Sequence, residues 1–133
     1  MYTSPHLIDI EERIRLNTLP VRNIAWHKTG IFKPGAVAFS SAQDFEETVT
    51  VLEKRAAESG VLLRFVPSDD PDLPRDSPNL MPDDQHANCS LALAAVRALL
   101  EAKCSESLGF IHLEDIERGV EQFNWPGRFQ HVP

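Results

Sequence analysis

The sequence lacks the features that would direct it to a membrane or to nucleic acid. No apolar run reaches the length that spans a bilayer, and residues 1–15 lack the basic-then-apolar pattern of a signal peptide. Basic side chains are scarce, with 13 Lys and Arg against 20 Asp and Glu, and the net charge of −7 repels phosphate backbones and anionic lipids. We therefore expect a cytoplasmic protein with no nucleic-acid or membrane partner.

Metal-ligating and nucleophilic residues are sparse as well. Cys89 and Cys104 share one helical pattern and are separated by about 22 Å along a helix, too far for a disulfide. Both are interpreted as reduced thiols packed as small apolar residues, and a catalytic thiol is the less favoured alternative. His86, His112 and His131 lack metal-ligand spacing, so we predict no metal site and no bound cofactor.

Apolar residues, by contrast, are sufficient for a folded core. They make up 42% of the 133 residues, a length that fits one domain, so residues 1–133 are predicted to form a single domain. Apolar runs at 36–39 and 61–66 flank a helical pattern that ends at Gly60, and this arrangement predicts two parallel buried strands joined by a right-handed crossover. The helix has Ser40 or Ser41 as its expected N-cap. Its apolar positions are Phe45, Val49, Leu52 and Ala56.

Shorter signals complete the prediction on either side of this unit. Asn23 is expected to cap a short helix at 24–29 that Gly30 ends, and Lys33–Gly35 should form a turn. The last amphipathic helix is marked by Leu113, Ile116, Val120 and Phe123. A long helix at 86–103 has one apolar face of Leu91, Ala95, Leu99 and Ala102, widened by Leu93, Val96 and Leu100.

Residues 67–85 have a different composition. Five prolines and six aspartates fall within 67–84, which cannot sustain a helix or a strand ladder. We therefore predict a surface loop. For the acidic run Asp69–Asp72, a solvated loop is favoured over a metal site, because proline fixes the backbone and the adjacent charges repel one another.

Four stretches resemble folylpolyglutamate synthases, in the order in which that family has them. They are TSPHLIDIEERIRLN at 3–17, NIAWHKTGIFKPG at 23–35, HANCSLALA at 86–94 and FNWPGRFQ at 123–130. The family is related to the Mur ligases and uses ATP and magnesium to couple glutamate to a folate. The resemblance implies an α/β remnant of a Mur-ligase central domain, three-layer-like, with a short mainly parallel sheet and about four helices.

The resemblance also implies roles for individual residues. Ser4 matches a serine that helps to hold magnesium, and Lys28 matches the lysine that such ligases carbamylate to steady metal and phosphate. Asn88 matches an asparagine near the nucleotide base, and Arg128 matches an arginine that reaches the terminal phosphate. In the parent fold these four residues face one nucleotide cleft.

Departures from the family pattern argue against ligase activity. None of the six glycines sits in a phosphate-binding loop pattern, and the family's loop would lie upstream of Thr3. Only TLPVR, residues 18–22, stands where the family has its other metal-binding residues, and the family continues after Arg128 into a glutamate-binding domain. We therefore expect a truncated chain without ATP-dependent ligation.

A vacated cleft suggests a different reaction. Our first hypothesis is an ATP-independent enzyme of secondary metabolism that isomerises or cyclises a small organic molecule. The second is a non-catalytic binding or regulatory module. Candidate catalytic residues are Lys28, His6, Arg128 and His27. Candidate ligand-binding residues are Ser4, Asn88, Trp26 and Trp125.

Structural roles are the alternatives for these same residues. Lys28 can be a surface charge, His6 can make a structural hydrogen bond, and Asn88 can cap a helix. Trp26 and Trp125 can be packing anchors. Finally, loss of neighbouring strands would expose sheet edges and apolar faces, which predicts a homodimer or higher homo-oligomer.

Overall fold

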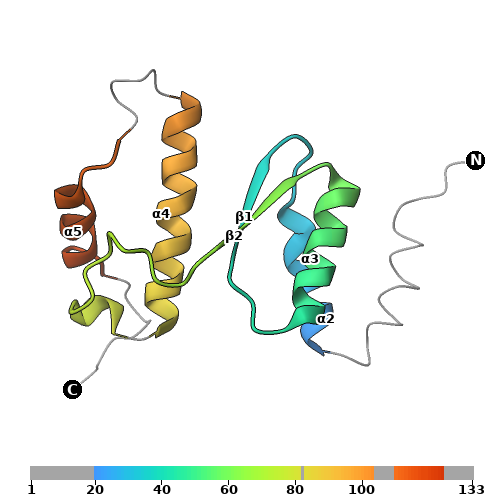
Figure 1. Ribbon diagram of the computed structural model, residues 1–133, viewed down its shortest axis with the longest axis horizontal. Coiled ribbons are helices and arrows are strands. Elements are labelled where there is room, and N and C mark those ends of the chain that lie inside the picture. Colours follow the sequence, from blue (N-terminus) through green and yellow to red (C-terminus); the bar gives the residue numbers. More distant parts are fainter. Residues whose placement is uncertain (1–19, 82, 104–109, 125–133) are drawn as a thin grey trace, which may run out of the picture. The chain divides into compact units, whose positions relative to one another are not determined.

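The computed structural model describes residues 20–81, 83–103 and 110–124 and shows an α/β protein (Figure 1). These residues contain four α-helices and a two-stranded parallel sheet, which confirms the predicted fold class. They form two compact units. The first comprises 20–38 and 43–64, and the second comprises the other described residues, 39–42, 65–81, 83–103 and 110–124. The single domain spanning 1–133 stays a prediction.

The sheet pairs β1 (Val37–Ser41) with β2 (Leu62–Val66), and the helix α3 (Glu46–Ser59) connects them. The Leu62 amide donates to the Ala36 carbonyl at 3.1 Å, and the Ala42 amide donates to the Val66 carbonyl at 2.9 Å. The predicted strand-helix-strand unit is therefore confirmed. The expectation of buried strands is wrong, because in the two strands only Val66 is buried. With two strands in the described sheet, each strand keeps one unpaired edge.

The first unit packs helix α2 (Pro20–Lys28) against α3. Ala25, Val51 and Leu52 form its buried core, with Trp26 and Leu63 packed against them. The described part of helix α2 starts at Pro20, and a first helical turn tolerates proline because proline lacks the N–H that such a turn leaves unpaired. Asn23 consequently lies inside the helix, and its predicted role as a cap is wrong. A short 3₁₀ helix, η1 (Thr29–Ile31), follows α2. It includes Gly30, the residue at which the sequence predicts the end of the helix.

The ends of α3 test two further predictions. Gly60 adopts the left-handed conformation with φ of 63° and its amide donates to the carbonyls of Ala56 and Ala57, which confirms the predicted end. The predicted serine N-cap is wrong: the cap is Phe45, without a side-chain hydrogen bond, because β1 runs on through Ser41. The turn before β1 is confirmed by the 3.0 Å bond from the Ala36 amide to the Lys33 carbonyl.

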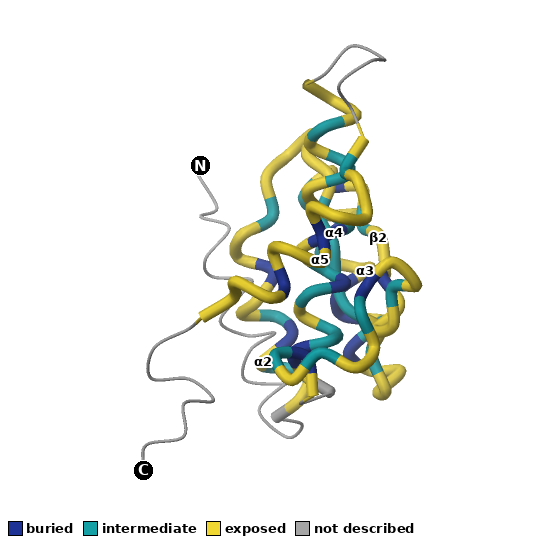
Figure 2. The backbone as a smooth tube through the Cα atoms, turned by 90° about the vertical axis from the view of Figure 1, so that its left-hand side faces the viewer, coloured by how far each residue is buried: buried dark blue, intermediate teal, exposed yellow. Residues whose placement is uncertain are grey.

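The second unit contains the long helix α4 (Asp83–Lys103), the short helix α5 (Leu113–Glu121) and the 3₁₀ helix η2 (Pro78–Leu80). The predicted apolar face of α4 is confirmed only in part: Leu93 is buried and Leu91 and Leu100 are half-buried. Leu99 is 56% exposed, and Ala95, Val96 and Ala102 are exposed as well. Figure 2 colours the backbone by this burial. The core consists of Leu73, Leu80, Leu93, Ile116 and Val120.

Two of those core residues belong to the segment of residues 67–85, called the proline-rich segment below. Leu73 and Leu80 are 4% and 5% exposed, so the segment predicted as a solvated surface loop supplies part of the core. It buries Leu93 and thereby decides which side of α4 faces inward. In α5, Ile116 and Val120 are buried as predicted, while Leu113 at its start and Phe123, two residues after its end, are exposed. No helix in the described part of the chain is long and apolar enough to cross a bilayer.

Candidate functional site

The predicted site residues lie in three places. Four of them, Ser4, His6, Trp125 and Arg128, fall outside the described residues, and their roles stay predictions. Trp26, His27 and Lys28 are consecutive at the end of α2 in the first unit, and Asn88 lies on α4 in the second. The structure therefore brings together the three α2 residues, and the predicted common cleft remains untested.

The end of α2 holds Trp26 in a defined environment. The Trp26 ring meets the His27 ring edge-on, with centroids 5.4 Å apart at 88°, and the Arg55 guanidinium lies 4.8 Å from the Trp26 ring centroid. Arg55 Nε also donates to Thr29 Oγ1 at 3.2 Å, and that hydroxyl donates to the Trp26 carbonyl at 2.6 Å. Trp26 thus links α2 to α3 through a cation–π contact, which favours the packing-anchor alternative.

His27 and Lys28 are exposed beside this anchor. Both lie in the last turn of α2, where the carbonyl end of the helix dipole favours positive charge. Their positions therefore suit a surface role and equally leave both groups accessible to a ligand.

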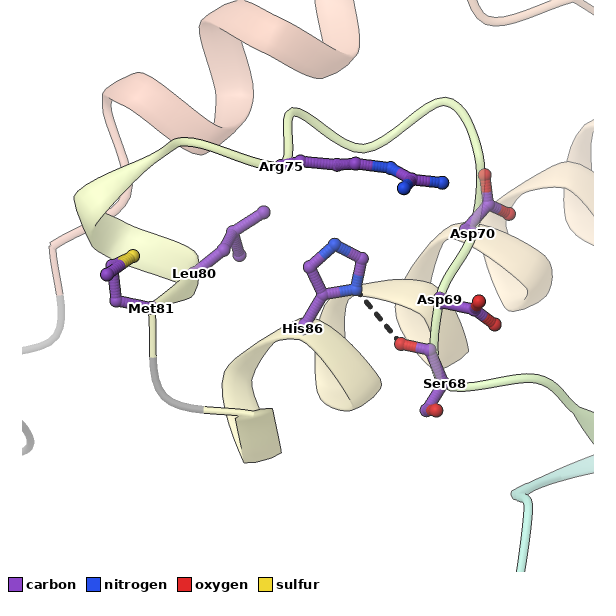
Figure 3. Close-up of a pocket in the computed structure, with 7 residues that line it drawn as sticks. All are labelled: Ser68, Asp69, Asp70, Arg75, Leu80, Met81 and His86. Carbon is purple, nitrogen blue, oxygen red and sulfur yellow. Dashed lines mark hydrogen bonds between the residues drawn. The ribbon is translucent and has the colours of Figure 1, made fainter.

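A pocket of about 570 Å³ lies in the second unit, at the start of α4 (Figure 3). The proline-rich segment, including η2, forms most of its wall. The first turn of α4 contributes a histidine. Its lining residues are Ser68, Asp69, Asp70, Arg75, Leu80, Met81 and His86.

His86 has a defined protonation pattern in this pocket. Its Nδ1 lies 2.9 Å from the Ser68 carbonyl oxygen. A carbonyl can only accept, so Nδ1 carries the proton and the neutral ring keeps its lone pair on Nε2. Figure 3 shows Nε2 facing the side of the pocket where Arg75 lies. The arrangement presents a proton acceptor to a bound molecule.

Some of the described charged side chains around the pocket form ion pairs and others do not. Arg97 of α4 contacts Asp70 Oδ2 through Nη1 at 2.6 Å and Asp72 Oδ2 through Nη2, so these carboxylates are paired. Asp69 and Arg75 make no ion pair with any other described residue. The lining side chains thus comprise two carboxylates and one guanidinium, beside the apolar Leu80 and Met81.

Asn88 and Cys89 follow the pocket histidine on α4. Asn88 is exposed, and its Nδ2 donates to Gln85 Oε1 at 3.4 Å; because α4 begins at Asp83, Asn88 is not the helix cap. Cys89 is a free thiol packed against the core, and burial raises the pKa of that thiol. A raised pKa keeps the thiol protonated near neutral pH, which supports the structural interpretation of Cys89.

Sequence reasoning missed both Arg75 and the role of His86. His86 begins the HANCSLALA stretch and lacks metal-ligand spacing, but its place at the start of a predicted helix is a usable signal. Arg75 stands between aspartates in a proline-rich segment, and no pattern there indicates a pocket. Within the described ranges, no group of three or more His, Cys, Asp or Glu is placed to hold a metal ion.

Comparisons with known proteins give the ancestry of the chain. It is 34% identical over 124 residues to the folylpolyglutamate synthase of Candida albicans, covering 84% of this chain and 24% of that protein. The corresponding enzyme of Neurospora crassa is 38% identical over 113 residues, covering 81% and 20%. A putative folylpolyglutamate synthase of Caenorhabditis elegans is 33% identical over 120 residues, covering 82% and 23%.

No protein-family profile and no solved structure matches the chain. The chain spans 20% to 24% of the length of these three curated relatives, and the match takes in most of its own length. The predicted resemblance is thus confirmed: the chain is a folylpolyglutamate synthase-like protein, homologous to a segment of the folylpolyglutamate synthases.

Proposed function

We propose that this folylpolyglutamate synthase-like chain binds a small neutral or zwitterionic organic molecule in the pocket of the second unit and isomerises or cyclises it without ATP. The observation that carries the proposal is the 2.9 Å contact of His86 Nδ1 with the Ser68 carbonyl oxygen, which leaves Nε2 facing the pocket. Because a carbonyl only accepts, we infer that Nδ1 carries the proton of the neutral ring. A positioned imidazole of this kind is a general acid and base near neutral pH.

The proton balance of such a reaction closes within the pocket. In an isomerisation, Nε2 takes a proton from one atom of the bound molecule and returns it to another. In a cyclisation, Nε2 takes the proton of an attacking hydroxyl and delivers it to the oxygen of the attacked carbonyl. Arg75 is the cation in the pocket that stabilises negative charge developing on that oxygen. No second substrate is consumed in either case.

The charge of the pocket supports a ligand other than ATP. Two carboxylates and one guanidinium line it, and Arg97 pairs with the Asp70 carboxylate. A polyphosphate would therefore meet repulsion from Asp69 and attraction from one lining cation, Arg75. A neutral molecule avoids that repulsion, and a zwitterion places its anionic group near Arg75 and its cationic group near Asp69. Leu80 and Met81 offer contact to an apolar portion.

The test begins with binding, measured by ¹⁵N–¹H NMR of the full chain titrated with neutral, zwitterionic and anionic small molecules and with magnesium ATP. Signals of His86 and Arg75 should shift with at least one neutral or zwitterionic molecule and stay unchanged with magnesium ATP. Shifts at the pocket produced by magnesium ATP, or hydrolysis of ATP above background, would contradict the proposal.

Catalysis is then tested on any molecule that binds. His86→Gln should lower product formation by at least about 100-fold, the usual size of a general acid–base contribution. His112→Gln is the matched control, because His112 is an exposed histidine outside the pocket lining. Equal activity of the His86 variant and the control rules out proton transfer at His86. Binding without any product in the natural chain replaces the catalytic proposal with the non-catalytic binding module.

A further inference from the structure

The geometry points to Ser90 as a positioning residue for His86: we propose that its buried hydroxyl holds the Ser68 carbonyl in place and so keeps the His86 proton on Nδ1. This inference rests on the proposed role of His86. It concerns a residue that neither the sequence patterns nor the pocket lining singled out.

Ser90 is fully buried, with 0% of its surface exposed, and its hydroxyl makes two hydrogen bonds to the proline-rich segment. The hydroxyl donates to the Ser68 carbonyl at 3.1 Å and accepts from the Asp70 amide at 3.0 Å. A serine inside a helix commonly bonds the carbonyl one turn earlier in its own helix. Here the side chain instead bonds a segment about 20 residues away in the sequence, so it fixes that segment to α4.

Ser90 and His86 act on the same atom. They are four residues apart on α4, which places both side chains on one face of the helix. Both contact the Ser68 carbonyl oxygen, whose two lone pairs accept one proton from the Ser90 hydroxyl and one from His86 Nδ1. Ser90 therefore determines where the acceptor of the His86 proton lies.

Arg97 contributes to the same attachment from further along α4. Its contacts to Asp70 and Asp72 fasten the segment two and four residues beyond Ser68. Arg97 follows Ser90 by two helical turns, so His86, Ser90 and Arg97 form one line of polar contacts along α4. Of Ser90 and Arg97, Ser90 is the one that shares an acceptor with His86, and we therefore assign the control of the tautomer to Ser90.

Removal of the Ser90 hydroxyl has a defined consequence for the ring. The Ser68 carbonyl loses its fixed orientation, and the Asp70 amide loses its acceptor. Free histidine side chains favour the proton on Nε2, so the neutral ring then shifts toward that tautomer. The pocket would receive an N–H donor where the natural chain presents a lone pair.

The test is ¹⁵N NMR of the histidine ring nitrogens in the full chain, about two pH units above the ordinary histidine pKa, with His86→Gln used to assign the signals. In the natural chain, neutral His86 should carry its proton on Nδ1. Ser90→Thr keeps the hydroxyl and should preserve that tautomer. Ser90→Val places a side chain with the shape of threonine there, without the hydroxyl. In this variant the ratio of Nδ1–H to Nε2–H tautomers should fall about fivefold to tenfold relative to Ser90→Thr, as expected for the loss of one hydrogen bond.

Each outcome decides the inference. Unchanged tautomer ratios in folded Ser90→Val and Ser90→Ala would reduce Ser90 to a purely structural role. In the natural chain, a ring protonated mainly on Nε2 overturns the inference directly, whether or not the variants fold. The measurement needs no ligand, so the failure of the proposed reaction is seen separately, as loss of the difference between His86→Gln and His112→Gln.

Discussion

The two units differ in what holds their helices. In the first, α2 and α3 pack against each other through apolar residues at helical spacing, and Leu52 and Ala56 are buried as the sequence pattern predicts. In the second, α4 is held by an irregular segment of prolines and aspartates through Leu73, Leu80, Arg97 and Ser90. Helical periodicity therefore identifies part of the core in both units, with Leu52 and Ala56 buried in α3 and Ile116 and Val120 buried in α5. It does worst in α4, where Leu93 is the buried member of the predicted face.

The largest expected effect tests whether the proline-rich segment contributes to the core of the second unit. Leu73→Ala should lower the free energy of unfolding of the second unit by roughly 2–5 kcal/mol, because Leu73 is 4% exposed and its removal leaves a cavity. Leu99→Ala is the matched control on the predicted face of α4. Leu99 is 56% exposed, so its truncation should change stability by less than about 0.5 kcal/mol.

Both variants can be measured by urea unfolding followed through NMR signals of each unit. Equal effects of the two substitutions would mean that the predicted face of α4 is the buried one after all, and the comparison between the units would fail.

Two glycine substitutions, one in each unit, should change stability by an intermediate amount. Gly60→Ala should destabilise the first unit by about 1–2 kcal/mol, because φ of 63° is strained for an alanine although the space around it is open. Gly119→Ala should stabilise α5 by up to about 1 kcal/mol, since Gly119 lies inside that helix, has no positive φ and faces open space. Thermal unfolding of the two variants checks the opposite signs, and a shift in the same direction contradicts the backbone explanation.

The smallest expected effect concerns the end of α2. Lys28→Ala should change the free energy of unfolding by less than about 0.5 kcal/mol, because Lys28 is exposed. Lys33→Ala, also at an exposed position in the first unit, is the control for loss of charge. If Lys28→Ala abolishes turnover of a molecule that Lys33→Ala still converts, the catalytic role predicted for Lys28 stands and the pocket histidine is not sufficient. Equal turnover leaves Lys28 as a surface charge.

The sequence by itself determined the ancestry, the α/β class and the connected strand-helix-strand unit. These features depend on local patterns: Gly60 ends α3 because it tolerates a left-handed backbone, and the apolar runs on either side of α3 form strands that pair in parallel. The family resemblance singles out Lys28, whose predicted role is tested by Lys28→Ala, and the catalytic role of His27 stays a prediction.

Only the tertiary structure decided where the candidate pocket lies. No sequence pattern around Arg75 or Ser68 indicates a pocket. His86 becomes a candidate only through its contact with a carbonyl eighteen residues earlier in the chain. The same holds for the core of the second unit, because burial of Leu73 and Leu93 arises when the proline-rich segment folds back onto α4. Contacts between segments distant in sequence have no periodicity of their own, and therefore composition alone assigned this segment to solvent.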